Sequence, residues 1–487
     1  MAESWVNYAE RIGSDLHLEL SGPGSKRAAL IRALRDAVHS GRLAPGTRLP
    51  PYRSLAADLG VARNTVADAY AELVAEGWLT ARQGSGTRVA ERSRPLHPAV
   101  LPRKPAPHPR ARSTRHDLRQ GTPDASGFPR TAWLASYRRA LHQAPNEVFG
   151  PGDPAGRPEL RAALAGYLAR ARGVRTEPDR IVICSGFAHA LRLLFGGGGG
   201  ARGAGGGGQP LRGPLAVEAY GLPFHRELLA AEGVRTVPLP LDEHGARVDR
   251  LTRERAVLLT PAHQFPTGGP LHAERRAAVV DWARARGAVV LEDDYDGEFR
   301  YDRKPVGALQ SLDPERVILI GSVSKSLSPA VRLGWMVLPE RYVGDVLAAK
   351  GEREAWASVL DQLALADLIV SGSYDRHVRQ MRQRYRGRRD RLVAALAERA
   401  PHIEVSGVAA GLHAVLRLPP GTERSAVKAA IWQGVALDGL AEFRHPDTDM
   451  PAHDGLVVGY ATPSEHAYAA ALDALCGALP PGGTQAS

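Results

Sequence analysis

Residues 322–332 read Ser-Val-Ser-Lys-Ser-Leu-Ser-Pro-Ala-Val-Arg, and they follow an apolar run at 316–320. Lysine is scarce in this chain of 487 residues, because 57 of its 63 basic residues are arginines. A lysine placed among small hydroxyl residues therefore suggests a role that a guanidinium group does not fill. An amine can lose its proton and form an imine, whereas the guanidinium of arginine stays protonated.

The residues around Lys325 suit a phosphate group beside that imine. Ser322 and Ser324 offer hydroxyl groups, and Arg332 offers a guanidinium that pairs with phosphate oxygens in a forked geometry. An imine-forming lysine next to a phosphate site indicates pyridoxal 5'-phosphate held on Lys325.

A second motif, Leu291-Glu292-Asp293-Asp294-Tyr295, closes another apolar run. In an extended chain Leu291, Asp293 and Tyr295 share one side, so Asp293 and Tyr295 can meet a ring together. Pyridoxal phosphate needs a carboxylate at its pyridine nitrogen and benefits from a phenol near its ring oxygen. The alternative is an acidic strand end in solvent, which the neighbouring Lys325 motif disfavours.

The region from about residue 119 onward predicts an α/β fold with a mostly parallel sheet. Short apolar runs alternate there with helical periods such as 275–286, and the runs lie at 180–184, 215–218, 256–260, 288–292 and 316–320. Ligands bind such sheets at the carboxyl ends of the strands. The candidate motifs fall there, including two weaker ones at 184–190 and 260–268; the first opens a helix whose backbone N–H groups suit a phosphate.

The N-terminal part predicts three helices and a hairpin. Leu30, Leu34 and Val38 lie four apart on a helix over 26–40 that Gly41 ends. A second helix is expected over 53–59, and a third over 63–76. Two helices joined by a tight glycine turn form a helix-turn-helix, whose second helix enters the major groove of DNA. Residues 78–89 predict two short strands around a glycine tip.

The patterns Gly-x-Leu-x-Pro-Gly-x-x-Leu-Pro, Leu-Gly-Val-x-Arg-Asn-Thr-Val and Gly-Ser-Gly-Thr, within residues 26–90, closely resemble the winged helix of the GntR family. The resemblance implies double-stranded DNA as a partner. It implies that the residues approaching DNA are Arg53, Arg63, Asn64 and Thr65, with Gln83 and Gly84 of the wing reaching the neighbouring minor groove. Ala62 departs from the family, which usually has Ser there; if that Ser capped the helix, its loss costs on the order of 1 kcal/mol.

Composition and charge divide the chain into a DNA-binding domain over 14–90, a linker over 91–118 and a large domain over 119–480. Residues 91–119 carry eight basic residues against two acidic ones and six prolines, which predicts an extended, semi-rigid linker. A solvated tether and direct contact with DNA are equally compatible with that stretch. The glycine run at 196–208 predicts an insertion to which we assign no function.

Residues 119–480 resemble a class I aminotransferase of pyridoxal phosphate fold type I, with a small C-terminal α+β subdomain. The Glu-Asp-Asp-Tyr and His-Gln-Phe-Pro-Thr-Gly variants, behind a GntR winged helix, resemble MocR-type transcription regulators. The resemblance implies that Lys325 forms the internal aldimine, Asp293 pairs with the pyridinium and Tyr295 approaches the ring oxygen. The residues that it implies for the phosphate are Ser322, Ser324, Arg332 and the backbone of Phe187 and Ala188.

The departures from aminotransferases concern the substrate side. Phe265 stands where they have Asn, leaving His263 or Gln264 as candidate substitutes, and we count His263 with the cofactor-binding residues. A ring-stacking aromatic is expected at Leu222, with Tyr220 or Phe224 as replacements. Val457 occupies the place of the Arg that binds the substrate carboxylate. A group that binds this carboxylate is then missing unless Arg417 or Arg444 supplies it.

We therefore expect a cytoplasmic, pyridoxal phosphate-dependent transcription regulator in which the cofactor, with or without an amino-compound effector, controls operator binding. The alternative is an active aminotransferase with an accessory DNA-binding domain; an apo scaffold is the third possibility. Fold type I implies a homodimer, domain-swapped as in MocR regulators. The two cysteines match no metal spacing, so no metal site is expected, and no apolar run approaches the roughly 20 residues that span a bilayer.

Overall fold

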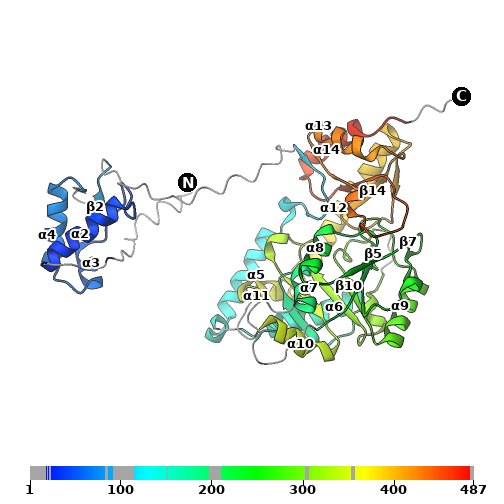
Figure 1. The fold of residues 1–487 in the computed structure, drawn as a ribbon, viewed down its shortest axis with the longest axis horizontal. Helices are drawn as coiled ribbons and strands as arrows, with labels where there is room; N and C mark the ends of the chain where they lie inside the picture. The colour runs from blue at the N-terminus through cyan, green and yellow to red at the C-terminus, as the bar shows by residue number, and fades with distance from the viewer. Residues whose placement is uncertain are drawn as a thin grey trace. The chain divides into compact units, whose positions relative to one another are not determined.

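The chain divides into two compact units, Met1–Arg112 and Ser113–Ser487. The computed structural model describes Leu18, Leu20 and residues 24–82, 86–91, 115–150, 152–196, 210–301, 306–351 and 357–482. The predicted linker therefore lies largely outside the described residues, as do residues 197–208 of the glycine run. Within the described part, no helix combines the length and the apolar character that crossing a membrane requires. Figure 1 shows both units.

The described part of the smaller unit contains three helices and a two-stranded hairpin, in agreement with the sequence prediction. Its elements are α2 (Lys26–His39), α3 (Tyr52–Asp58), α4 (Arg63–Ala75), β1 (Leu79–Arg82) and β2 (Gly86–Val89). Leu30, Leu34 and Val38 are buried, which confirms the predicted face of α2. Gly41 follows that helix with a φ of 75°, a left-handed conformation that glycine adopts without steric cost.

The core of this unit is a cluster in which side chains of α2, α3, α4 and the hairpin meet. Leu55, Val66, Tyr70 and Leu73 are buried in it, and Tyr70 Oη donates to Pro50 O at 3.1 Å. Val74 of α4 is only partly buried. The unit thus has a hydrophobic core of its own.

The larger unit contains a seven-stranded sheet in the order β4-β12-β11-β10-β9-β5-β6. Its strands are β4 (Ile181–Cys184), β5 (Leu215–Glu218), β6 (Thr236–Leu239), β9 (Ala256–Leu259), β10 (Val289–Asp293), β11 (Val317–Ser322) and β12 (Gly334–Val337). Neighbouring strands from β11 to β6 are parallel, and only β12 runs antiparallel, to both β11 and β4. The prediction of a mostly parallel sheet is confirmed, and each of its five apolar runs is a strand.

Helices cover both faces of this sheet (Figure 1). The helices of the larger unit are α5 (Arg130–Gln143), α6 (Pro158–Arg172), α7 (Phe187–Phe195), α8 (Pro223–Ala231), α9 (Ala273–Arg286), α10 (Glu340–Lys350), α11 (Val359–Val370), α12 (Ser373–Arg399), α13 (Glu423–Trp432) and α14 (Glu465–Ala478). Leu319 of β11 packs with α6 and α11, whereas the next residue, Ile320, packs with α7 and α8. The alternation of side chains along a strand explains why both faces are apolar.

A smaller antiparallel sheet, in the order β13-β14-β17-β16, forms the C-terminal subdomain with α13 and α14. Its strands are β13 (Glu404–Ser406), β14 (His413–Arg417), β16 (Asp438–Gly439) and β17 (Gly455–Gly459), and two-residue strands elsewhere are β3 (His116–Asp117), β7 (Leu241–Asp242), β8 (Gly245–Ala246) and β15 (Val435–Ala436). Because β3 pairs with β15, His116 and Asp117, at the end of the predicted linker, join this subdomain.

We predict that Ala62→Ser stabilises the smaller unit. Ala62 is the N-cap of α4 and makes no side-chain cap bond, whereas Ser25 caps α2 by accepting from Ala28 N at 3.3 Å. A serine cap satisfies one free N–H and contributes about 1 kcal/mol, which corresponds to roughly fivefold slower hydrogen exchange of the α4 amides in the full chain. Ala67→Ser, the same change inside the helix, is the control and should give no gain. Equal exchange rates in both variants would contradict this assignment.

Candidate functional site

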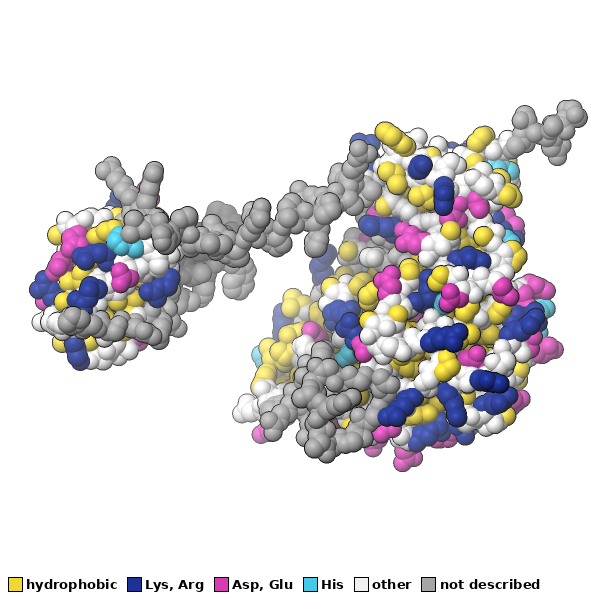
Figure 2. Space-filling model, viewed as in Figure 1, with side chains coloured by type: hydrophobic (Ala, Val, Ile, Leu, Met, Phe, Trp, Pro, Cys, Tyr) yellow, Lys and Arg dark blue, Asp and Glu magenta, His cyan; other side chains and the backbone are white. Residues whose placement is uncertain are grey.

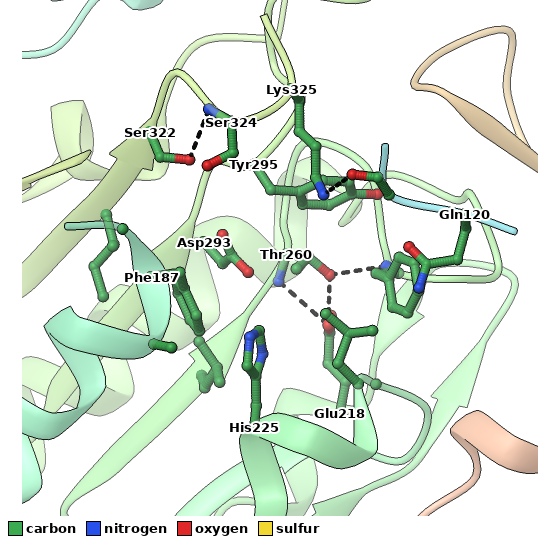
Figure 3. A pocket seen from close by; sticks show the side chains of 18 of the residues that line it. Gln120, Phe187, Glu218, His225, Thr260, Asp293, Tyr295, Ser322, Ser324 and Lys325 are labelled. Atoms are coloured by element: carbon green, nitrogen blue, oxygen red, sulfur yellow. Dashed lines mark hydrogen bonds between the residues drawn. The ribbon is translucent and has the colours of Figure 1, made fainter. Parts of the chain in front are cut away.

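One cavity lies at the carboxyl ends of β5, β9, β10 and β11, where ligands bind to parallel sheets (Figure 3). Eight of the nine residues that the sequence singled out for the cofactor line it: Phe187, Ala188, Asp293, Tyr295, Ser322, Ser324, Lys325 and Arg332. Gln120 and Gly121 reach it from the segment that follows the linker, and Leu412 and His413 reach it from the C-terminal subdomain. The fold thus brings together groups from four distant parts of the chain.

The end of β10 sends alternate side chains to opposite sides, as an extended chain requires. Asp293 and Tyr295 line the cavity. Glu292 points away and accepts from the backbone N–H groups of Leu309 and Gln310 at 2.7 and 2.8 Å. Asp294 forms a buried, two-pronged ion pair with an arginine of α6. This arrangement confirms the predicted sidedness and excludes the alternative of an acidic strand end in solvent.

Asp293 is placed to balance a cation inside the cavity. Burial raises the pKa of its carboxyl group well above the usual range, and the charges of Asp294 and Asp296 raise it further. Within the described residues no side chain donates a hydrogen bond to it. A protonated ring nitrogen beside Asp293 would supply the missing partner and keep the carboxylate ionised.

Lys325 follows β11, and its side chain reaches the backbone of the turn at Gly121. Its Nζ donates to Gly121 O, and a Cβ atom on Gly121 would lie 3.1 Å from Nζ, a tight contact; the φ of 94° at Gly121 also favours glycine. Burial lowers the pKa of the lysine, although the charges of Asp293 and Asp296 oppose the shift. A lowered pKa favours the neutral amine, which is the form that attacks a carbonyl.

Donors for a phosphate gather at the other end of the cavity. Ser322 ends β11, Ser324 N donates to Ser322 Oγ at 3.4 Å, and α7 begins nearby at Phe187. Arg332 is the one described residue other than glycine with a positive φ, 55°, a conformation that costs free energy and often marks a functional position. Two hydroxyls, a guanidinium and the N-terminus of a helix are a donor set that fits a phosphate.

His263 lies behind Tyr295 rather than on the cavity wall. Its Nδ1 is 2.8 Å from Asp296 Oδ2 and 2.9 Å from Tyr295 Oη. Burial and the charge of Asp296 raise the pKa of Tyr295 well above its usual range. His263 is thus placed to orient Tyr295, and its direct contact with a cofactor remains a prediction. Gln264 bonds to Tyr220 O, Phe265 O and Thr267 instead.

The substrate side of the cavity is apolar. Phe265, Leu222 and Tyr220 line it, whereas Phe224 is 56% exposed and lies away from it. Val457 packs in the same apolar cluster as Phe265 and Tyr220. Arg444 donates to Thr448 O and Met450 O, and Arg417 is exposed beside Glu404, so neither guanidinium lies in the cavity.

The sequence analysis missed three groups that line the cavity: Glu218, His225 and His413. Glu218 accepts from Thr260 Oγ1 at 2.6 Å, and the ring of His225 lies 4.7 Å from that of Phe187 (Figure 3). Burial lowers the pKa of His225 to about 4, so its imidazole is neutral at physiological pH. Glu218 ends a strand beside β9 in the way that Asp293 ends β10, and that position was the available signal.

The candidate DNA surface lies at the start of α4 and on α3. Arg53, Arg63 and Asn64 are exposed and Thr65 is half-buried, while Gln83 and Gly84 lie outside the described residues. Arg27 and Arg35 are paired with Glu72 and Glu76, but Arg53 and Arg63 form no ion pair within the described part of the chain. Figure 2 shows basic side chains on the visible face of this unit. The two unpaired guanidinium groups are available to phosphates or bases.

Comparisons with known proteins agree with both units. Residues 26–89 match the family described as bacterial regulatory proteins, gntR family, and residues 117–452 match aminotransferase class I and II. The HTH-type pyridoxine biosynthesis transcriptional regulator PdxR of Corynebacterium glutamicum is 32% identical over 91% of this chain and 93% of its own. The probable rhizopine catabolism regulatory protein MocR of Rhizobium meliloti is 33% identical over 89% of each chain.

Solved structures share the fold of the larger unit. An archaeal alanine:glyoxylate aminotransferase is 23% identical with a TM-score of 0.65, covering 74% of this chain and 89% of that one. LysN of Thermus thermophilus, an α-aminoadipate aminotransferase complexed with N-(5'-phosphopyridoxyl)-L-leucine, is 24% identical with a TM-score of 0.64, covering 74% and 91%.

We predict that Glu218→Gln removes part of the pH dependence of stability. Burial raises the pKa of Glu218 from 4.5 to about 7, so between these values the folded state holds a proton that the unfolded chain releases. Stability therefore falls as pH rises through this window, by on the order of 3 kcal/mol, and is level above it. Glutamine keeps the acceptor for Thr260 but does not titrate. The free energy of unfolding of the variant, measured with urea on the larger unit, should therefore rise relative to that of the wild type between pH 4.5 and 7.

Glu243→Gln, at an exposed position, is the control for that experiment. Its stability should follow the wild type at every pH. A Glu218→Gln curve parallel to that of the control would show that Glu218 is ionised in the folded protein.

Proposed function

Since this chain belongs to the MocR-type transcriptional regulators, in which a GntR-family DNA-binding domain is joined to an aminotransferase class I and II domain, we propose that pyridoxal 5'-phosphate on Lys325 controls its binding to operator DNA. In this proposal residues 14–90 bind DNA, 91–118 link the parts and 119–480 bind the cofactor. The chain is a DNA-binding regulator, and the cofactor is what the proposal adds.

The observation that supports the proposal most strongly is the composition of one cavity. The same cavity is lined by Lys325, by a carboxylate, Asp293, and by a set of phosphate donors at Ser322, Ser324 and Arg332. When bound, pyridoxal phosphate supplies an electrophilic carbonyl and an electron-withdrawing ring. Asp293 would hold the proton of the ring nitrogen, Tyr295, positioned by His263, would approach the ring oxygen, and Ser322, Ser324 and Arg332 would hold the phosphate.

The contact between Lys325 and Gly121 supports a coupling between ligand binding in this cavity and the linker that leads to the DNA-binding domain. Lys325 Nζ donates to Gly121 O, and Gly121 lies four residues after Asp117 of β3, the strand at the end of the linker. When Lys325 binds a cofactor or is released from it by an amino-compound effector, this bond changes. The segment at Gly121, which is joined to the linker, is then the first to change its contacts.

The substrate side of the cavity supports regulation over turnover. Phe265 and Val457 replace the residues with which aminotransferases hold an amino acid, and positioning contributes several kcal/mol to such reactions. We therefore propose that any transamination is vestigial.

We also infer a homodimer. Leu134 and Leu141 lie seven residues apart on α5 and are 59% and 44% exposed. Val370, on the helix α11 that packs against α5, is 77% exposed. Phe149, shortly after α5, is 58% exposed. Large apolar side chains gathered on neighbouring elements favour association with a second copy.

We predict that Lys325→Ala abolishes covalent attachment of the cofactor while the fold is retained. Borohydride reduction followed by mass spectrometry should find pyridoxal phosphate fixed to the wild type and none fixed to the variant, because no other amine lies at this position. Lys428→Ala, on α13, is the control and should retain the cofactor. A cofactor still fixed to the Lys325→Ala protein would refute the assignment.

We predict that Arg63→Ala weakens operator binding. A guanidinium that reads a base contributes about 1–3 kcal/mol, and binding as a whole should weaken steeply with salt. Arg27→Gln, whose guanidinium is already neutralised by Glu72, is the control. An equal loss on all sequences would make Arg63 a phosphate anchor, and no loss would exclude α4 as the recognition helix.

A further inference from the structure

One wall of the cavity carries no charge, and we call it the apolar wall: Tyr220, Leu222 and Phe265. Tyr220 and Phe265 are 2% and 7% exposed, and Val457 and Phe443 pack with them in one cluster. A carboxylate placed against this wall loses its water and gains no opposite charge in exchange. Desolvation without a compensating partner is costly for an ion and much less costly for a hydroxyl or an amide.

The two arginines near the apolar wall donate to backbone carbonyls. Arg226 lines the cavity, but it donates to Gly221 O at 2.7 Å, to Phe443 O at 3.2 Å and to Arg444 O at 3.3 Å. Arg444, which does not line the cavity, donates from Nη2 to Thr448 O and Met450 O at 2.9 and 2.6 Å, and its buried Nε has no hydrogen-bond partner among the described residues. Among the described residues that line the cavity, the other cations are Lys325 and Arg332, which serve the amine and phosphate sites. Beside the apolar wall, the lining guanidinium of Arg226 thus directs its Nη atoms at backbone carbonyls.

Two of the polar groups near this wall, His413 and Gln120, are neutral. His413 is buried, and its Nε2 lies 3.1 Å from Pro266 O, so the ring carries its proton on Nε2 and leaves Nδ1 as an acceptor. Burial lowers the pKa of His413 to about 3, which keeps the ring uncharged. Gln120, next to Gly121, turns its amide toward the cavity (Figure 3). An acceptor nitrogen repels a carboxylate and accepts from a hydroxyl or an amide N–H.

We propose that the effector is a primary amine whose other end is uncharged and hydrogen-bonding, such as an amino alcohol or an amino amide, and that α-amino acids are disfavoured. The apolar wall and the neutral His413 and Gln120 recognise that end. The inference rests on the proposed function, because the amine end of the ligand is placed by a cofactor on Lys325.

The test compares ligands that differ only at this end. The cofactor-loaded full chain is titrated calorimetrically with L-alanine and L-alaninamide, and with L-serine and serinol. The uncharged member of each pair should bind at least about tenfold more tightly, equivalent to about 1.4 kcal/mol. Equal affinity, tighter binding of the carboxylate, or no binding of either member overturns the inference.

A variant reverses the preference by restoring the residue types that the chain has replaced. Phe265→Asn combined with Val457→Arg should raise the affinity for L-alanine relative to L-alaninamide, because a guanidinium then compensates the carboxylate. Arg417→Gln, an exposed position outside the cavity, is the control and should keep the wild-type preference. If the double variant does not fold, the wild-type comparison decides alone.

Cofactor content separates the two possible failures. Each protein is checked for borohydride-fixed pyridoxal phosphate before titration. A wild-type protein that fixes no cofactor refutes the proposed function itself. A protein that fixes the cofactor and prefers the carboxylate members refutes only the identity of the effector.

Discussion

The ion pair between Asp294 and Arg172 is the constraint on which the cavity depends. Both side chains are buried, with 6% and 4% of their surface exposed, and Arg172 Nε and Nη2 lie 2.7 and 2.8 Å from the two carboxylate oxygens. Removing one partner of such a pair costs about 3–5 kcal/mol, because the other charge is left buried alone. The pair fixes Asp294 on the outer side of the strand end, and the alternation of the strand then directs Asp293 and Tyr295 inward.

A second buried arginine holds the segment that follows the linker. Arg388 of α12 is fully buried, and it donates to Asp124 Oδ2 at 2.8 Å and to Ala461 O at 3.0 Å. It therefore ties the segment that follows the linker to the C-terminal subdomain. That segment carries Gln120 and Gly121, so the residues nearest the linker are held against Lys325.

An aminotransferase must hold both a cofactor and an amino acid, and the described lining of this cavity has groups suited only to the first. The groups suited to hold a cofactor are charged and hydrogen-bonding, and they lie on strand ends and a helix start that the sheet positions rigidly. The groups that would hold an amino acid are replaced by Phe265 and Val457, which pack with Tyr220 and Phe443 into an apolar cluster. Because burying these side chains needs no charge compensation, the cluster is stable without a ligand. Cofactor binding can therefore persist where substrate positioning does not.

The sequence by itself determined the features that follow from local spacing. The helices of the smaller unit and the strands of the sheet were predictable from apolar periods, and the sidedness of Asp293 and Tyr295 followed from the strand period of two. Lys325 stood out because the chain otherwise uses arginine. The family resemblance of both units also came from short contiguous motifs.

Only the tertiary structure decided which distant residues share the cavity. Glu218, His225 and His413 belong to three segments whose approach depends on the sheet order and on the C-terminal subdomain, and no local pattern encodes that order. The same reason explains why Arg417 and Arg444, both candidates from the sequence, are engaged elsewhere, and why His263 lies behind Tyr295. Local periodicity specifies what a segment is, whereas the long-range packing of sheet and subdomain specifies what it meets.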